Sequence, residues 1–247
     1  MISGIFFDIV LTGDFMKEKR VLLKLSGEAL KNNKDGIIDI EYIGSICKKI
    51  KKLWSLDYEI SIVIGGGNIW RGRDNLYIDS TLSDKIGILS TTINGMILHS
   101  VFKKLDINSV LLNAFDIENI ASKSTEKEIK NAIKNKDIII FSGGTGHVGC
   151  STDTAAALRI IDIDSDILIK LTNVDGVYDK DPKKYKDAVK FEMLTYDEVI
   201  EKNLKVMDLN SIVLCKNNKK KILVLDIKEL ENLDQILKEN NKGTLIQ

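Results

Sequence analysis

Three glycine-bearing loops contain residues whose types and spacing suit the binding of phosphate. The first reads Lys24-Leu25-Ser26-Gly27-Glu28, with a lysine directly before a tight turn. A lysine ammonium beside exposed backbone amides suits the oxygens of a polyphosphate. The lysine precedes the glycine, so this is not a Walker loop. An ordinary strand end explains the same residues equally well.

The second loop, Gly65-Gly66-Gly67-Asn68, is followed by Arg71. Three consecutive glycines lack every Cβ, so their backbone can approach an anion closely and turn several N–H groups toward it. Arg71 can add a guanidinium group that binds phosphate through two hydrogen bonds. A purely structural turn seldom needs three glycines, so we favour ligand contact.

The third loop, Ser142-Gly143-Gly144-Thr145-Gly146, leads to Ser151-Thr152-Asp153. These last residues open a predicted helix, whose exposed N–H groups form an anion site. One of the three side chains can also cap that helix. A carboxylate is unexpected at a phosphate-binding helix start unless it orients another group, so Asp153 is a candidate functional residue.

A fourth segment runs from Lys170 through Thr172-Asn173-Val174-Asp175-Gly176-Val177-Tyr178 to Asp181-Pro182. Its Thr, Asn and Asp side chains suit a nucleotide, and Tyr178 offers an aromatic face to a base. An Asx-stabilised turn that ends in Asp-Pro explains these residues as well.

The elements that must position these loops follow an α/β pattern, in which short β-branched runs alternate with longer helical patterns. Several runs are apolar on both faces, which is typical of buried parallel strands. The predicted strands are Arg20–Leu25, Glu59–Ile64, Ser109–Leu112, Asp137–Phe141, Ile167–Leu171 and Lys221–Asp226. The predicted helices are Glu41–Leu56, Leu82–Leu105, Thr125–Lys134, Thr152–Ile161 and Lys228–Glu239.

Each of the three glycine loops follows a predicted strand. Open α/β sheets bind their ligands beyond the carboxyl ends of the strands, so the loops are expected to share one crevice. The predicted helix Leu82–Leu105 contains Gly87 and Gly95, which indicates a kink or close helix packing.

The length, net charge and apolar runs of the chain indicate which partners the protein has. The chain has 247 residues, of which 44% are hydrophobic, enough for a single domain with one sizeable core. Lys plus Arg (36) equals Asp plus Glu (36), so the positive excess of a nucleic-acid binder is missing. The apolar runs are shorter than a membrane span requires. We therefore expect neither nucleic acid nor a membrane as a partner.

Cys47, Cys150 and Cys215 lie far apart, without the spacing of a zinc site or a disulfide framework. A reducing compartment fits this usage, so we expect a cytoplasmic protein. The stretch Met1–Phe15 has no early basic residue and resembles neither a signal nor a transit peptide. Because Met16 precedes the first strand directly, we expect residues 1–15 to be an N-terminal extension and 16–247 to be one domain.

The ordered strings KLSGEAL, VIGGGNIWRG, FSGGTG with STDTAAALR, LTNVDGVYDKDP and LKVMDL span nearly all of residues 16–247. In order and separation the chain resembles the bacterial-type UMP kinases of the amino-acid-kinase family. The resemblance implies a three-layer αβα sandwich with a mostly parallel central sheet. It also implies ATP-dependent phosphorylation of UMP to UDP, with UMP over the N-terminal part and ATP over the C-terminal part. Family members use Mg²⁺ with ATP, usually form hexamers and are regulated by GTP and UTP.

Carried over by position, the resemblance gives catalytic roles to Lys24, Arg71 and Asp153. It places ATP against Lys24, Leu25, Ser26, Gly27, Gly67, Arg71, Thr172, Asn173, Tyr178 and Asp181. It places UMP against Gly66, Asp84, Thr145, Gly146, His147, Val148, Gly149, Cys150, Ser151 and Thr152, with Asp84 at the ribose. Because Mg²⁺ sheds water reluctantly, we expect ATP phosphates and water to bind it and predict no protein ligand for a metal.

One stretch departs from the family pattern. Family members usually have aromatic residues after Thr145-Gly146, whereas this chain reads His147-Val148-Gly149-Cys150. The loss of bulk bears on the packing around the uracil and on contacts between subunits. The Ser-Thr-Asp end of the motif is retained, so phosphate handling is expected to be intact.

Three other interpretations remain. A related kinase could act on an acyl carboxylate such as that of acetylglutamate or aspartate, although its acceptor site would differ from the pattern around Arg71 and Asp84. A nucleotide-binding sensor could keep the fold without catalysis. A dinucleotide-dependent dehydrogenase fits less well, since Gly65–Gly67 lacks the Gly-x-Gly-x-x-Gly spacing.

Overall fold

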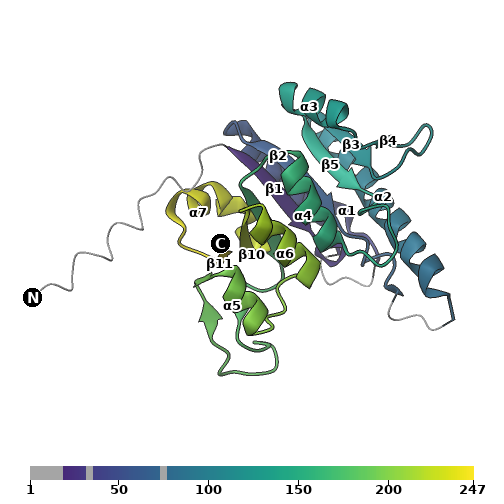
Figure 1. The fold of residues 1–247 in the computed structure, drawn as a ribbon. Helices are drawn as coiled ribbons and strands as arrows, with labels where there is room; N and C mark the ends of the chain where they lie inside the picture. Colours follow the sequence, from purple (N-terminus) through teal and green to yellow (C-terminus); the bar gives the residue numbers. More distant parts are fainter. Residues whose placement is uncertain (1–18, 32–35, 73–76) are drawn as a thin grey trace, which may run out of the picture.

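The computed structural model describes residues 19–31, 36–72 and 77–247. The expected extension over residues 1–15 lies outside this part of the chain and stays a prediction. Within the described residues, one sheet has the strand order β4-β3-β5-β2-β1-β6-β10-β11-β9, and all its pairings are parallel except β10 with β11 (Figure 1). Its strands are β1 (Arg20–Leu25), β2 (Glu59–Ile64), β3 (Ser109–Asn113), β4 (Ser122–Lys123), β5 (Ile138–Ser142), β6 (Ile167–Thr172), β9 (Met193–Leu194), β10 (Lys221–Asp226) and β11 (Thr244–Ile246). A separate antiparallel pair consists of β7 (Val177–Tyr178) and β8 (Lys190–Phe191).

Helices cover both faces of the sheet (Figure 1). One apolar core joins one face to α1 (Ile40–Ser55), α2 (Ser80–Lys104), the 3₁₀ segment η3 (Ile227–Asn232) and α7 (Leu233–Glu239). A second core joins the other face to α3 (Glu126–Lys134), α4 (Thr152–Asp162), α5 (Tyr196–Glu201) and α6 (Leu209–Asn217). The predicted three-layer αβα sandwich with a mostly parallel sheet is confirmed.

The alternation of side chains along strand β1 determines which face of the sheet Lys24 occupies. Val21, Leu23 and Leu25 belong to the core under α1, whereas Leu22 belongs to the core under α4. Burial of each such side chain stabilises the fold by about 1.5–3 kcal/mol. Because side chains alternate along a strand, Lys24 shares the face of Leu22 and points toward the α4 layer.

The predicted bounds hold within two residues for all six predicted strands and for four of the five predicted helices. Side-chain caps explain where several helices begin. Helix α2 starts at Ser80 because the Asp79 side chain accepts a hydrogen bond from the N–H of Leu82 at 3.1 Å. Close packing at Gly95 is confirmed, since an added Cβ would lie 2.7 Å from Leu111 Cδ1. Although α2 has 25 residues, no described helix is both long and apolar enough to cross a membrane.

The predicted helix Lys228–Glu239 is wrong over its first half. Residues 227–232 form the 3₁₀ segment η3, and α7 begins only at Leu233. Ile227, Leu230 and Leu233 are buried at a spacing of three residues, which matches the 3₁₀ repeat rather than the α-helical one. The short elements β4, β7, β8, β9, β11, α5 and α6 were not predicted.

Candidate active site

The glycine loops meet at one edge of the sheet, because parallel strands present their carboxyl ends together. The N–H of Gly65, which follows β2, donates to the carbonyl of Leu25 at the end of β1 over 2.8 Å. An added Cβ on Gly27 would lie 2.5 Å from the backbone nitrogen of Gly67. The first and second loops are therefore in direct contact, which agrees with the expectation that they lie at the same edge of the sheet.

A cluster of three charged side chains, Lys24, Asp153 and Lys170, forms the centre of this edge. Lys24 Nζ lies 2.7 Å from Asp153 Oδ1, and Lys170 Nζ lies 2.9 Å from Asp153 Oδ2. All three side chains are at most 17% exposed. Lys24 and Lys170 are register partners on the adjacent parallel strands β1 and β6, so they share a face, and Asp153 reaches them from the first turn of α4.

Burial and charge act against each other on these groups. Burial would raise the pKa of Asp153, but the two lysines outweigh it and hold the pKa below its ordinary value. Burial lowers the pKa of Lys170, which the Asp153 carboxylate only partly offsets and the charge of Lys24 reinforces. The cluster holds two cations side by side at the place where the glycine loops expose their amides. Such an arrangement suits an anion that carries more than one negative charge.

We expect the lowered pKa of Lys170 to appear in the pH profile of the reaction. A depressed pKa means that Lys170 loses its proton below the ordinary value of 10.5, so the ATP-directed kcat/KM should fall on the alkaline side before ordinary lysines titrate. Lys170→Arg should shift this fall to higher pH, because a guanidinium stays charged. If kcat/KM for ATP falls at the same alkaline pH in Lys170→Arg as in the wild type, the titration of Lys170 does not cause the fall.

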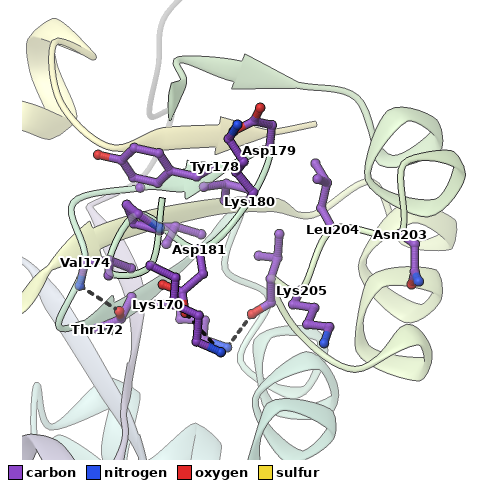
Figure 2. Close-up of a pocket in the computed structure, with 16 residues that line it drawn as sticks. Lys170, Thr172, Val174, Tyr178, Asp179, Lys180, Asp181, Asn203, Leu204 and Lys205 are labelled. Atoms are coloured by element: carbon purple, nitrogen blue, oxygen red, sulfur yellow. Dashed lines mark hydrogen bonds and ion pairs between the residues drawn. The ribbon is translucent and has the colours of Figure 1, made fainter. Parts of the chain in front are cut away.

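The largest of three cavities at this edge, about 580 Å³ and called the larger cavity below, begins at Lys170 and extends between β6, β10 and residues 203–206. Figure 2 shows Tyr178 and Asp181 on one side of it and Leu204 and Lys205 on the other. Thr172, Tyr178 and Asp181, three of the predicted ATP contacts, line the cavity. Local bonds hold two of them, since Thr172 Oγ1 accepts from the N–H of Val174 and the Tyr178 hydroxyl donates to Asp175.

Other predicted ATP contacts lie elsewhere. Asn173 lines a neighbouring cavity of about 260 Å³ together with Glu28. The side chain of Leu25 is fully buried in the core. Ser26 Oγ accepts from the N–H of Ala29 and begins a 3₁₀ turn, η1 (Gly27–Leu30).

Arg71 extends back over the first two loops. Its Nη2 lies 2.5 Å from Glu28 Oε1, and its Nε donates to the carbonyl of Gly67 at 3.2 Å. The guanidinium is thus held by Glu28, the neighbour of Gly27, and by Gly67, and the resemblance places both of these glycines against ATP. Glu28 was not assigned a role there, although its place next to Gly27 was a usable signal.

The smaller cavity, about 220 Å³, lies between α2 and the third glycine loop. Five of the ten predicted UMP contacts line it, together with residues that the sequence analysis did not assign. The predicted residues are Gly66, Asp84, His147, Cys150 and Thr152, and the unassigned ones include Trp70, Ser83, Thr91 and Gly144.

The remaining predicted UMP residues do not line this cavity; they are Thr145, Gly146, Val148, Gly149 and Ser151. Two of them make defined contacts. The N–H of Gly149 donates to Asp84 Oδ2 at 2.7 Å, so Asp84 holds the loop. Ser151 caps α4 by accepting from the N–H groups of Asp153 and Thr154, and its hydroxyl donates to Asp208.

Lys170 is the main residue that sequence reasoning missed. A lysine inside the apolar run Ile167–Leu171 was the available signal, since a buried strand tolerates an ammonium only beside a partner. Asp208 was missed as well. It accepts hydrogen bonds from Ser151, Thr154 and Ser211 and thereby joins the starts of α4 and α6.

Comparisons with known proteins show the family of the chain. The family model described as the amino acid kinase family matches residues 19–226. The chain is 41% identical to the uridylate kinase of Rickettsia felis over 94% of its own length and 97% of the relative's. It is 42% identical to the uridylate kinase of Thermosipho melanesiensis, over 92% and 98%.

Solved structures show the same similarity. The UMP kinase of Ureaplasma parvum matches with a TM-score of 0.87 and 36% identity, over 94% of this chain and 100% of that one. The UMP kinase of Bacillus anthracis matches with a TM-score of 0.88 and 32% identity, over 93% and 96%.

Proposed function

Because the chain belongs to the amino acid kinase family, we propose that it transfers the γ-phosphoryl group of ATP to UMP and forms ADP and UDP. The observation that carries the proposal is the Lys24–Asp153–Lys170 cluster between two cavities. Lys170 lines the larger cavity, and Thr152, the neighbour of Asp153, lines the smaller one. A phosphoryl group that passes between the cavities would pass the two lysines.

We assign ATP to the larger cavity, with its base near Tyr178 and its phosphates toward Lys170 and the first glycine loop. We assign UMP to the smaller cavity, with its ribose near Asp84 and its phosphate toward Gly66 and the start of α4. In this arrangement the N-terminal part of the chain binds UMP and the C-terminal part binds ATP. Volumes of about 580 and 220 Å³ support the assignment of the larger nucleotide to the larger space.

The chemistry needs little acid–base help. The attacking oxygen of UMP belongs to a phosphate that is already ionised, so we assign no general base, and neither His99 nor His147 is required. The barrier consists mainly of repulsion between two anions and of charge that develops on the transferred group. We assign the offset of that charge to Lys24, Lys170, Arg71 and the glycine amides, and the spacing of the two lysines to Asp153.

We propose that Mg²⁺ accompanies ATP. Within the described residues, no group of three or more His, Cys, Asp or Glu side chains could form a cage for a metal. This donor set fits a cation that is held mainly by ATP phosphates and water, as Mg²⁺ usually is. When bound, Mg²⁺ supplies additional positive charge on the transferring phosphates.

A coupled assay of ADP release with UMP, CMP and acetylglutamate as acceptors tests the function. We expect ADP formation to depend on UMP. ADP release with acetylglutamate but not with UMP would support the acyl-carboxylate alternative. Binding of ATP and UMP without ADP release would support the sensor.

Cys150 gives a direct test of the acceptor site. It is exposed and lines the smaller cavity, whereas burial raises the pKa of both Cys47 and Cys215 to about 12 and keeps them unreactive. UMP at ten times its Kd should slow alkylation of Cys150 about ten-fold by mass action, whereas ATP alone should not. Peptide mass spectrometry measures the rate. Equal rates of Cys150 alkylation with and without UMP would contradict the assignment of UMP to this cavity.

The remaining expectations are proposals about assembly and control. We propose a homohexamer in the cytoplasm with GTP and UTP as effectors. Leu82, Leu89, Ile93 and Met96 are exposed along one side of α2, which supports self-association, and the three cysteines are unpaired, which supports a reducing compartment. The effectors rest on the resemblance alone. Light scattering measures the subunit count, and addition of GTP or UTP to the ADP-release assay tests the effectors.

A further inference from the structure

Helix α2 carries a row of buried polar side chains in the middle of its length. Ser90, Thr91, Thr92 and Asn94 are each at most 3% exposed. Buried polar groups destabilise a fold unless they are hydrogen-bonded, so the partners of this row indicate its purpose.

Asn94 is bonded to the second glycine loop. Its Nδ2 donates to the carbonyl of Gly65 at 2.7 Å and to Asn68 Oδ1 at 2.7 Å, and Asn68 Nδ2 donates back to Asn94 Oδ1 at 3.1 Å. Asn68 also packs against the first loop, because its Oδ1 occupies the place that a Cβ on Gly27 would take. One side chain of α2 therefore holds two loops.

Thr91 and Thr92 reach the third glycine loop. Thr91 Oγ1 accepts the N–H of Gly143 at 2.7 Å, and Thr92 Oγ1 donates to Asn113 Oδ1 at 3.1 Å. Asn113 is fully buried, and its Oδ1 occupies the place that a Cβ on Gly143 would take. The arrangement repeats that of Asn68 and Gly27, since a buried asparagine bonded to α2 again packs against a loop glycine.

Glycine loops need such anchors because they have no side chains to hold them. The missing Cβ atoms let the backbone approach phosphate, but they also leave it more conformational freedom than other residues have. A misplacement of about 1 Å in a phosphoryl-transfer site can reduce the rate about 100-fold. The anchors must therefore come from a neighbouring rigid element.

We propose that Asn94 and Thr91 are positioning residues. They fix the three glycine loops relative to α2, so that the phosphates of both nucleotides are held in the correct relative position for transfer. The loops that hold the two nucleotides are then anchored to the same rigid helix. The activity readout of this inference rests on the proposed function. The structural readout below does not.

Asn94 gives the more specific activity test, because it lines neither the cavity assigned to ATP nor the cavity assigned to UMP. Asn94→Leu removes the loop bonds at similar volume, and we expect kcat to fall about ten-fold with little change in the KM for ATP or UMP, as for an interaction that matters in the transition state. Leu98→Ala, at a fully buried apolar position of the same helix, is the matched control for lost stability. Assayed below its melting temperature, it should keep kcat near that of the wild type. An equal fall in both variants would overturn the proposal.

Thr91 offers a second pair of variants in case Asn94→Leu does not fold. Thr91→Val keeps the shape but removes the acceptor for Gly143, whereas Thr91→Ser keeps the hydroxyl. We expect Thr91→Val to lose activity and Thr91→Ser to retain it. Equal activities would overturn the role of the hydroxyl.

Hydrogen exchange separates this inference from the function. Amides of residues 65–68 should exchange faster in Asn94→Leu, and those of residues 143–146 faster in Thr91→Val, while Leu98→Ala should leave both near the wild-type rates. If the wild type forms no ADP with UMP, the proposed function fails and the exchange pattern still decides the positioning role. Unchanged exchange in both loop variants would overturn it.

Discussion

Lys24→Ala is expected to lower kcat by about 10²–10³-fold, because a preorganised charge at the transferring group contributes roughly 3–4 kcal/mol to transition-state stabilisation. Lys24 is 6% exposed and stands where β1 meets the first glycine loop. Its removal leaves Asp153 paired with Lys170 and lowers the positive charge at the point where two anions must meet. Steady-state kinetics with ATP and UMP measure the effect.

Two variants make this result specific. Lys24→Arg keeps the charge but not the geometry of the ammonium, so it should restore only part of the rate. Lys130→Ala removes an exposed lysine of α3 that pairs with Glu126, and it should leave kcat unchanged. Turnover of Lys24→Ala within a few-fold of the wild type would exclude Lys24 from the transfer step.

Asp153→Asn is expected to affect both the rate and the stability. Without the carboxylate, the ammonium groups of Lys24 and Lys170 repel each other and lose their fixed spacing, which we expect to lower kcat about 100-fold. Loss of one partner from a buried charge cluster should also lower the free energy of unfolding by about 3 kcal/mol at neutral pH. Kinetics and urea unfolding measure the two effects.

The pH dependence of that stability difference is a further signature. The pKa of Asp153 is depressed in the folded state, so its contribution is present above the ordinary carboxyl pKa of 3.8 and is lost as the pH falls through the folded value. The wild type and Asp153→Asn should therefore converge in stability in acid. Asp162→Asn is the matched control on α4, since its partially exposed pair with Arg159 should have little effect. A stability difference that does not shrink as the pH falls below 3.8 would contradict the assigned role of Asp153.

Residues 147–150, which differ from the family pattern, lie at the smaller cavity and are held by a backbone contact. This stretch was identified from sequence as a departure from the family pattern, and His147 and Cys150 line the smaller cavity. Gly149 has a φ of +76°, which favours glycine, and its N–H is held by Asp84. The loop therefore has a backbone anchor from α2 in place of bulky side chains.

Local patterns were sufficient to predict the elements and loops that depend on neighbours in the chain. Apolar runs such as Glu59–Ile64 predict buried strands, and the glycine loops that follow such strands are predicted to lie at their carboxyl ends. The short helix α5 was missed, because six residues carry little periodic signal and helices of that length are stabilised mainly by tertiary packing. Helix α6 is as long as α3, but its apolar residues are not concentrated on one face, so it lacks the helical pattern that predicted α3. The start of η3 was missed because a spacing of three residues fits one turn of either kind of helix.

The sequence by itself determined the fold class, the three glycine loops, and Lys24, Arg71 and Asp153 as charged candidates, because each of these follows from residue type and short-range order. Only the tertiary structure decided which charges meet. The register of β1 against β6 brings Lys170 beside Lys24, although 146 positions separate them in the sequence numbering, and α4 delivers Asp153 between them. Likewise, the bonds from α2 to Gly65 and Gly143 depend on how a helix packs on a sheet. Strand register and helix docking are set by contacts between distant segments, and no local pattern of residues specifies them.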